Sequence, residues 1–127
     1  MIELDHCIVP SRDKAASARQ LAELLGVAWG PARFGPFVAV YLNDGLTLDF
    51  FETHDAFPVE HFCFRAPQHE FDAIRARLQA AGIAYRSMVA GPIDHHVDTQ
   101  FGGMGLYWNE PDGHQWEMLT VSYARLT

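Results

Sequence analysis

Residues 111–117 of the chain are Pro-Asp-Gly-His-Gln-Trp-Glu, and residues 43–49 match them with Asn-Asp-Gly-Leu-Thr-Leu-Asp. In both stretches an Asp-Gly pair leads into an apolar run that contains a single carboxylate. An Asp-Gly pair between apolar segments is a strong short-range signal for a β-hairpin. The chain therefore contains two related hairpins, with Asp49 in the second strand of one and Glu117 in the second strand of the other.

A second pair of motifs opens the two halves. Asp5-His6-Cys7-Ile8 corresponds to Glu60-His61-Phe62-Cys63, so that an acid and a histidine begin a strand-like run in each half. Each half thus holds one histidine in its first strand and one carboxylate in its last. We interpret the two histidine-carboxylate pairs as parts of one metal site on a pseudo-twofold axis.

The first half, about residues 2–52, contains a strand, a helix and a hairpin in that order. An apolar run ends at Pro10, and apolar residues at helical spacing continue to Gly26, with Ser11 and Asp13 as candidate N-caps. The elements expected are a strand at 2–9, a helix at 15–25, a short strand near 27–29, and hairpin strands at 37–42 and 46–52.

The second half, about residues 59–123, repeats this order. The elements expected are a strand at 61–65, a helix at 71–81, an extended segment at 83–89, and hairpin strands at 105–109 and 115–121. Neither half can bury both faces of its sheet alone. We predict a single α+β domain over residues 1–127, in which two tandem βαβββ units form a half-open, curved β-barrel with the helices outside.

The composition limits the partners of the chain. A net charge of −7 argues against nucleic acid or an anionic membrane surface, because both favour basic patches. No apolar run approaches the ~20 residues that span a bilayer, and no signal region opens the sequence. Two cysteines do not make a disulfide framework. We expect a cytoplasmic protein that acts on a small molecule.

The two carboxylates interrupt strands that are otherwise apolar, and a buried charge of this kind needs a cation, a hydrogen-bond donor or a proton. His6, His61 and Glu117 are therefore predicted as metal ligands, with Asp49 as a fourth candidate. Two imidazoles with one or two carboxylates suit a divalent ion, and the set of two His and one carboxylate is used by non-haem Fe(II) oxygenases. Fe(II) is favoured, and Mn(II), Zn(II), Ni(II) and Co(II) are alternatives.

Other residues receive less specific predictions. Aromatic side chains in the strands and in the loop 90–103 supply apolar surface for a substrate pocket above the metal: Tyr41, Phe51, Phe101, Tyr107 and Trp108. The remaining histidines and the cysteines are expected to have structural places: Cys7 and Cys63 in the core, His114 at the surface, and His95 and His96 in a solvated loop.

Three stretches resemble the vicinal oxygen chelate superfamily, which includes glyoxalase I, extradiol dioxygenases and bleomycin and fosfomycin resistance proteins. They are the strand with His6, the strand Glu60-His61-Phe62, and residues 107–118 with Pro-Asp-Gly and then Glu117. The resemblance implies that His6, His61 and Glu117 hold a divalent cation. Glyoxalase-like members take a fourth carboxylate from the position of Asp49, whereas extradiol dioxygenases use three ligands.

The segments 34–37, 43–50 and 101–107 further resemble a small dioxygenase-like group within that superfamily. The function expected is a metal-dependent oxidoreductase whose substrate, small or aromatic, chelates the ion through two neighbouring oxygens, with Glu117 in the catalytic centre. Two alternatives stay open. One is a glyoxalase-type lyase or isomerase, in which a displaced carboxylate moves a proton. The other is a metal-free resistance protein that only binds a small molecule.

The connector between the halves bears on assembly. Residues 53–58 are few and include a proline, which limits how freely the second half folds back on the first. We therefore expect a homodimer with shared sites, in which His6 and Asp49 of one chain meet His61 and Glu117 of the other.

Overall fold

The structure of the chain is a computed structural model that describes residues 1–125. The last two residues of the expected domain, 126 and 127, lie outside the described part. Two compact units divide the chain, unit 1 (Met1–Pro58) and unit 2 from Val59 onward. At 12 and 13 residues, both described helices are too short to cross a bilayer, which takes about 20 apolar residues.

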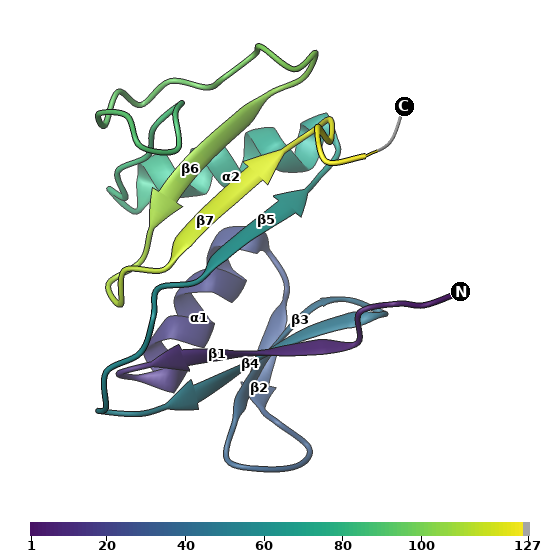
Figure 1. The fold of residues 1–127 in the computed structure, drawn as a ribbon, viewed down its shortest axis with the longest axis vertical. Helices are drawn as coiled ribbons and strands as arrows, with labels where there is room; N and C mark the ends of the chain where they lie inside the picture. Colours follow the sequence, from purple (N-terminus) through teal and green to yellow (C-terminus); the bar gives the residue numbers. More distant parts are fainter. Residues whose placement is uncertain (126–127) are drawn as a thin grey trace. The chain divides into compact units, whose positions relative to one another are not determined.

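Unit 1 is a βαβββ unit with a four-stranded sheet (Figure 1). Its strand order is β1-β4-β3-β2, in which β1 and β4 are parallel and the other neighbours are antiparallel. The first strand of the unit therefore lies against its last. The elements are β1 (His6–Ser11), α1 (Lys14–Leu25), β2 (Ala28–Pro31), β3 (Val38–Asn43) and β4 (Leu46–Glu52).

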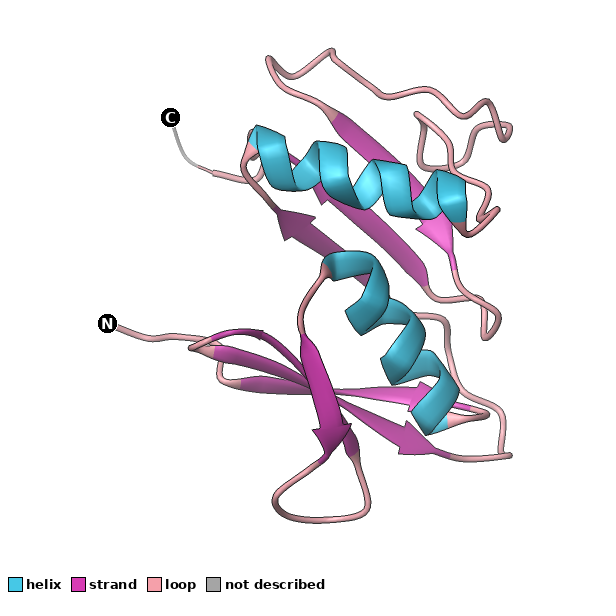
Figure 2. Cartoon of the chain, turned by 180° about the vertical axis from the view of Figure 1, so that it is seen from behind, coloured by secondary structure: helices cyan, strands magenta, loops and turns pink. Residues whose placement is uncertain are grey.

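Helix α1 covers one face of this sheet (Figure 2). Because strand side chains alternate between the two faces, every second residue of the central strands points to the helix, including Val40, Leu48 and Phe50. These side chains and Leu21 of the helix are buried. The helix leaves the opposite face of the sheet uncovered, and the polar side chains of the sheet, including Asp49, lie on that face.

The ends of α1 follow their sequence signals. The Asp13 side chain accepts a hydrogen bond from the Ala16 backbone N–H at 3.0 Å, which satisfies one donor of the first turn. Gly26 ends the helix in the left-handed conformation, with φ 72°, where a residue without Cβ is least strained.

Replacing Asp13 with alanine should lower the free energy of unfolding by about 1 kcal/mol, because the cap bond to the Ala16 N–H is lost. Asp13→Ser is the control, since serine can make the same bond and should retain most of the stability. Urea denaturation followed by circular dichroism measures both variants. Equal stability of Asp13→Ala and the unmodified chain would show that the cap contributes nothing.

Within its described residues, unit 2 has one strand fewer, with the order βαββ and a three-stranded sheet, β5-β7-β6 (Figure 1). Strand β5 is parallel to β7, and β6 is antiparallel to it. Helix α2 lies along one face (Figure 2), where it buries Phe71, Ile74 and Leu78 on the side of Trp108 and Trp116. The elements are β5 (His61–Arg65), α2 (Gln68–Ala80), β6 (Gly105–Asn109) and β7 (Gln115–Leu119).

The α+β class and the two tandem units confirm the fold expected from the sequence, but two details differ. Strand β1 does not end before Pro10; it begins at His6 and includes the proline. The carbonyls of Asp5 and Ser11 accept bonds from Thr47 and Thr53, so odd-numbered residues of β1 bond to β4. The nitrogen of Pro10 consequently faces away from β4, where a missing N–H costs no bond to that strand.

The second difference is the segment 83–89, which was expected to be extended and forms only one bridge to β6. Arg86 exchanges two backbone hydrogen bonds with Tyr107, both at 2.9 Å. The next residue, Ser87, bonds within the following loop: the Asp94 carboxylate accepts from the Ser87 N–H at 3.0 Å and from its hydroxyl at 2.5 Å. The next bonding position of β6, Gly105, exchanges its two backbone hydrogen bonds with Asp98, at 2.7 and 2.9 Å, so residue 88 does not extend the pairing.

Candidate functional site

The two histidine-carboxylate pairs occupy equivalent places in the two sheets. In unit 1, Asp49 is paired with Ile8, two residues after His6. In unit 2, Glu117 is paired with Cys63, two residues after His61. Each histidine is on the edge strand of its sheet and each carboxylate is on a strand with neighbours on both sides. The two pairs have different spacings in the sequence. The equivalent register nevertheless places the histidine and the carboxylate of each pair on the same face of their sheet.

In unit 1 this face is the one not covered by α1. His6 and Asp49 both line a cavity of about 350 Å³, together with the aromatic ring of Tyr41. Phe34 and Arg33 from the loop between β2 and β3 lie at the same cavity. The sheet therefore presents one imidazole and one carboxylate to an open space that is large enough for a small molecule.

A neighbouring carboxylate orients His6. The Nδ1 atom of His6 lies 2.7 Å from Oδ2 of Asp5. This hydrogen bond raises the pKa of His6, and the charges of Asp5 and Asp49 act in the same direction. Metal-binding histidines commonly make such a bond through one ring nitrogen and bind the ion through the other. The arrangement leaves Nε2 of His6 as the nitrogen available for a ligand.

In unit 2 the histidine and the carboxylate are in direct contact. Nε2 of His61 lies 3.2 Å from Oε1 of Glu117, whose side chain is only 2% exposed. Both residues line a cavity of about 370 Å³ on the face that α2 does not cover. Glu117 is thus the most buried of the four predicted metal ligands, and the imidazole of His61 beside it is about half exposed.

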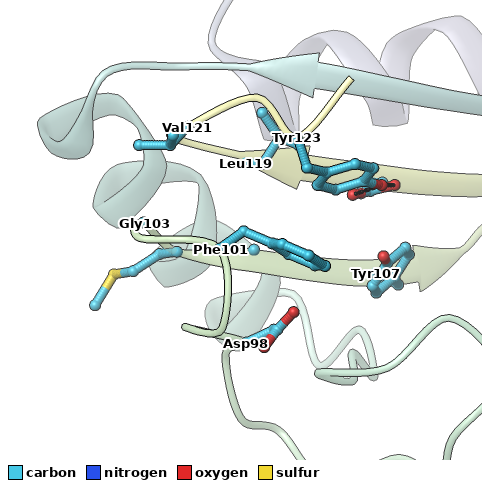
Figure 3. A pocket seen from close by; sticks show the side chains of 10 residues that line it. Asp98, Phe101, Gly103, Tyr107, Leu119, Val121 and Tyr123 are labelled. Carbon is cyan, nitrogen blue, oxygen red and sulfur yellow. Dashed lines mark hydrogen bonds between the residues drawn. The ribbon is translucent and has the colours of Figure 1, made fainter. Parts of the chain in front are cut away.

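Tyr123, which the sequence analysis did not select, caps this carboxylate. Its hydroxyl lies 2.6 Å from Oε2 and 2.8 Å from Oε1 of Glu117. Figure 3 shows the Tyr123 ring beside Phe101, with a centroid separation of 4.9 Å, and Tyr107 on the same wall. The hydrogen bond to Glu117 raises the pKa of Tyr123, so the phenol remains a donor at neutral pH.

The predicted pocket residues divide between the two open faces. Tyr41 is 41% exposed in the unit 1 cavity, and Phe51 lies on the same face with its ring 6.1 Å from that of Phe37. In unit 2, Tyr107 stacks on His61 at 6.5 Å, and Phe101 covers Tyr123. Their role toward a substrate stays a prediction.

Three structural expectations were wrong. Trp108 belongs to the core, because its register places it on the α2 side of the sheet, where it is 1% exposed. His114 is buried rather than at the surface, and its Nδ1 accepts a bond from the Glu60 N–H at 2.9 Å. Cys63 is exposed on the open face. Partial burial, with Glu117 acting in the same direction, raises the pKa of the Cys63 thiol to about 12, so the thiol stays protonated.

The donor atoms of His61 and Glu117 in unit 2 have the separation that a divalent cation requires. Two protein ligands at roughly 2.0 to 2.2 Å from one ion and at right angles to each other are about 3 Å apart. His61 Nε2 and Glu117 Oε1, 3.2 Å apart, match this requirement without moving. Each unit by itself supplies one imidazole and one carboxylate, and within residues 1–125 no group of three His, Cys, Asp or Glu side chains could hold an ion.

Comparison of the fold with solved structures identifies the superfamily to which the chain belongs. The chain superposes on two oxidases at 35% and 37% identity over nearly its whole length, and it belongs to the vicinal oxygen chelate superfamily. Both of these relatives are named as oxidases.

The particular relatives are as follows. Oxidase ChaP-H1 is 37% identical, with a TM-score of 0.90, over 98% of this chain and 100% of that chain. Oxidase ChaP-H2 is 35% identical, with a TM-score of 0.90, over 97% and 96%. The lactoylglutathione lyase of Agrobacterium tumefaciens shares the fold at 19% identity, with a TM-score of 0.69, over 93% and 92%. No protein-family model and no curated protein matches the chain.

Proposed function

We propose that the protein is a metal-dependent oxidoreductase whose His6, His61 and Glu117 bind one divalent ion, with Asp49 as a fourth ligand. The observation that carries this proposal is the equivalent register of the two pairs, since it places an imidazole and a carboxylate on the open face of each sheet. Because each unit supplies only two donors, a site with three protein ligands requires both units. Fe(II) is the favoured ion, since two His and one carboxylate with open positions suit it.

The ion would supply Lewis acidity toward two neighbouring oxygens of a substrate. The chain itself supplies the orientation of the ligands. Asp5 fixes one nitrogen of His6, and the β5-β7 register places His61 against Glu117. Tyr41 and Phe34 in unit 1, and Tyr107 in unit 2, give apolar surface for an aromatic or similarly flat substrate.

The oxidative chemistry rests on relatives rather than on geometry. Two proteins named as oxidases share more than a third of this sequence over almost its full length. The lyase relative, at 19% identity, shares the fold and does not favour lyase chemistry for this chain. The carboxylate that a lyase would use to move a proton is nevertheless present, so the experiment includes that reaction.

Reconstitution decides between these activities. Metal-free protein is loaded anaerobically with Fe(II), Mn(II), Zn(II), Ni(II) or Co(II) in turn. Each form is assayed for oxygen uptake with catechols and hydroxyquinones, and for lyase activity with α-keto thiohemiacetals. We expect oxygen uptake with Fe(II) and none with Zn(II), because Zn(II) has no redox chemistry.

His61→Ala is the control variant in these assays and should lose the metal while keeping the fold, because the packing of β5 comes from Phe62 and Phe64 on its other face. Lyase activity with several ions and no oxygen uptake would assign the alternative reaction. Tight binding of a test compound by metal-free protein, with no turnover in any form, would instead assign a binding protein.

A further inference from the structure

The hydrogen bond between Tyr123 and Glu117 in unit 2 has no role in the proposed function. Both oxygens of Glu117 lie within hydrogen-bond distance of the Tyr123 hydroxyl, Oε1 at 2.8 Å and Oε2 at 2.6 Å, but only Oε1 also has His61 beside it. Oε1 lies beside His61 Nε2 at 3.2 Å, whereas the Tyr123 hydroxyl lies closest to Oε2, at 2.6 Å. A phenol carries one proton and donates to one oxygen at a time. When Oε1 is used as a ligand, Oε2 remains the acceptor for Tyr123.

We propose that Tyr123 is a positioning residue that keeps Glu117 a one-oxygen ligand. This inference rests on the proposed function, in which Glu117 and His61 hold a divalent ion. A carboxylate that binds through both oxygens takes two coordination positions. A substrate that chelates through neighbouring oxygens needs two positions open. By holding Oε2, Tyr123 preserves a position that the substrate would otherwise lose.

The chain fixes Tyr123 through the segment that follows β7. The Thr120 N–H donates to the Met104 carbonyl at 2.9 Å, and the Thr120 hydroxyl accepts from the Met104 N–H at 2.9 Å. The Phe101 ring then packs on Tyr123 at a centroid separation of 4.9 Å (Figure 3). Backbone and ring contacts therefore both direct a partly exposed tyrosine toward a buried carboxylate.

The test is the variant Tyr123→Phe, which removes the hydroxyl and keeps the ring that packs on Phe101. Infrared difference spectra between the metal-free and the Zn(II)-loaded full-length chain report the separation of the two carboxylate stretching bands. That separation is wide for one-oxygen ligation and narrow for two. We expect a wide separation in the unmodified chain and a narrow one in Tyr123→Phe, with Glu117→Gln and Asp49→Asn assigning the bands.

A chelating probe gives a second measurement. The Zn(II)-loaded chain is titrated with 4-nitrocatechol, whose two neighbouring oxygens need two open positions. Loss of outer-shell partners typically costs about 10- to 100-fold in metal affinity or activity, so we expect the affinity for the probe to fall roughly tenfold or more in Tyr123→Phe. The matched control is Tyr85→Phe, because the buried Tyr85 hydroxyl accepts from Arg75 and Gln79 in the same unit. It should lose stability and keep both the spectrum and the probe affinity.

The outcomes separate the two proposals. If the unmodified chain binds no Zn(II), or if its Glu117 bands do not respond to Zn(II), the proposed function fails and the role of Tyr123 fails with it. If the Glu117 bands respond but Tyr123→Phe behaves like the unmodified chain, only the positioning role is overturned. Tighter Zn(II) binding by Tyr123→Phe with an unchanged band separation would mean that the hydroxyl competes with the ion, which also overturns it.

Discussion

Glu117→Gln should abolish tight binding of a divalent ion while the chain keeps its fold. The change removes the negative charge of the most buried ligand, whose side chain is 2% exposed, and leaves a shape that still fits beside Tyr123. Because loss of outer-shell partners alone costs about 10- to 100-fold in affinity, the loss of a ligand should cost more than ~100-fold. Calorimetric titration of metal-free protein with Zn(II) and with Fe(II) under anaerobic conditions measures the effect.

Glu110→Gln is the matched control for this variant. Glu110 is also a buried carboxylate of unit 2, and its Oε1 accepts from the His114 N–H at 2.8 Å. Its burial raises its pKa, so its loss tests the general effect of removing a desolvated acid. We expect an unchanged metal affinity. Equal affinity in the unmodified chain and Glu117→Gln would remove Glu117 from the ligand set.

Mixing two inactive chains should restore activity if the sites are shared across a homodimer, which we propose as the working assembly. His6→Ala damages only unit 1 and Glu117→Ala only unit 2. In a shared arrangement, the heterodimer combines the intact unit 1 of one chain with the intact unit 2 of its partner at one of its two sites. Random reassortment of equal amounts should then recover about a quarter of the unmodified activity.

The readout requires proof that the two chains have exchanged. Differently tagged chains, refolded together and purified through both tags, give the heterodimer alone, and its metal content and activity are compared with those of each parent. Sites formed within one chain predict no recovery in that sample, because every site then lacks either His6 or Glu117. A pure monomer in solution, with one full site per chain, would equally reject the shared arrangement.

Most of the fold could be predicted because its signals are local. Two Asp-Gly turns fix the hairpins, and Gly26 ends α1 where the apolar spacing ends. The two details that failed depend on other parts of the chain. Whether a strand tolerates Pro10 depends on its place at the edge of a sheet, and the segment 83–89 pairs with β6 only at Arg86, because Asp98 takes the next position, opposite Gly105.

Within the candidate site, the residues that could be predicted from the sequence were those that occur in both repeated motifs. Strand alternation and the matching motifs identified the positions of His6, His61, Asp49 and Glu117, which the register then placed on the open faces. Tyr123 was missed because it follows β7 in an irregular segment, where periodicity gives no information about direction. Tyr123 follows Glu117 by six residues, and this spacing becomes meaningful only when the path of the chain at residue 120 is known.

The pairing of the first strand of each unit with its last has a consequence for how the chain folds. Contacts between residues far apart in the sequence carry a large entropic cost of loop closure and form slowly. The β1-β4 and β5-β7 pairings are contacts of this kind, and they are also the pairings that bring each histidine to its carboxylate. During synthesis the hairpins and helices can form early, but neither half of the site exists until its unit has closed. A chain interrupted before β7 would therefore carry His61 without Glu117.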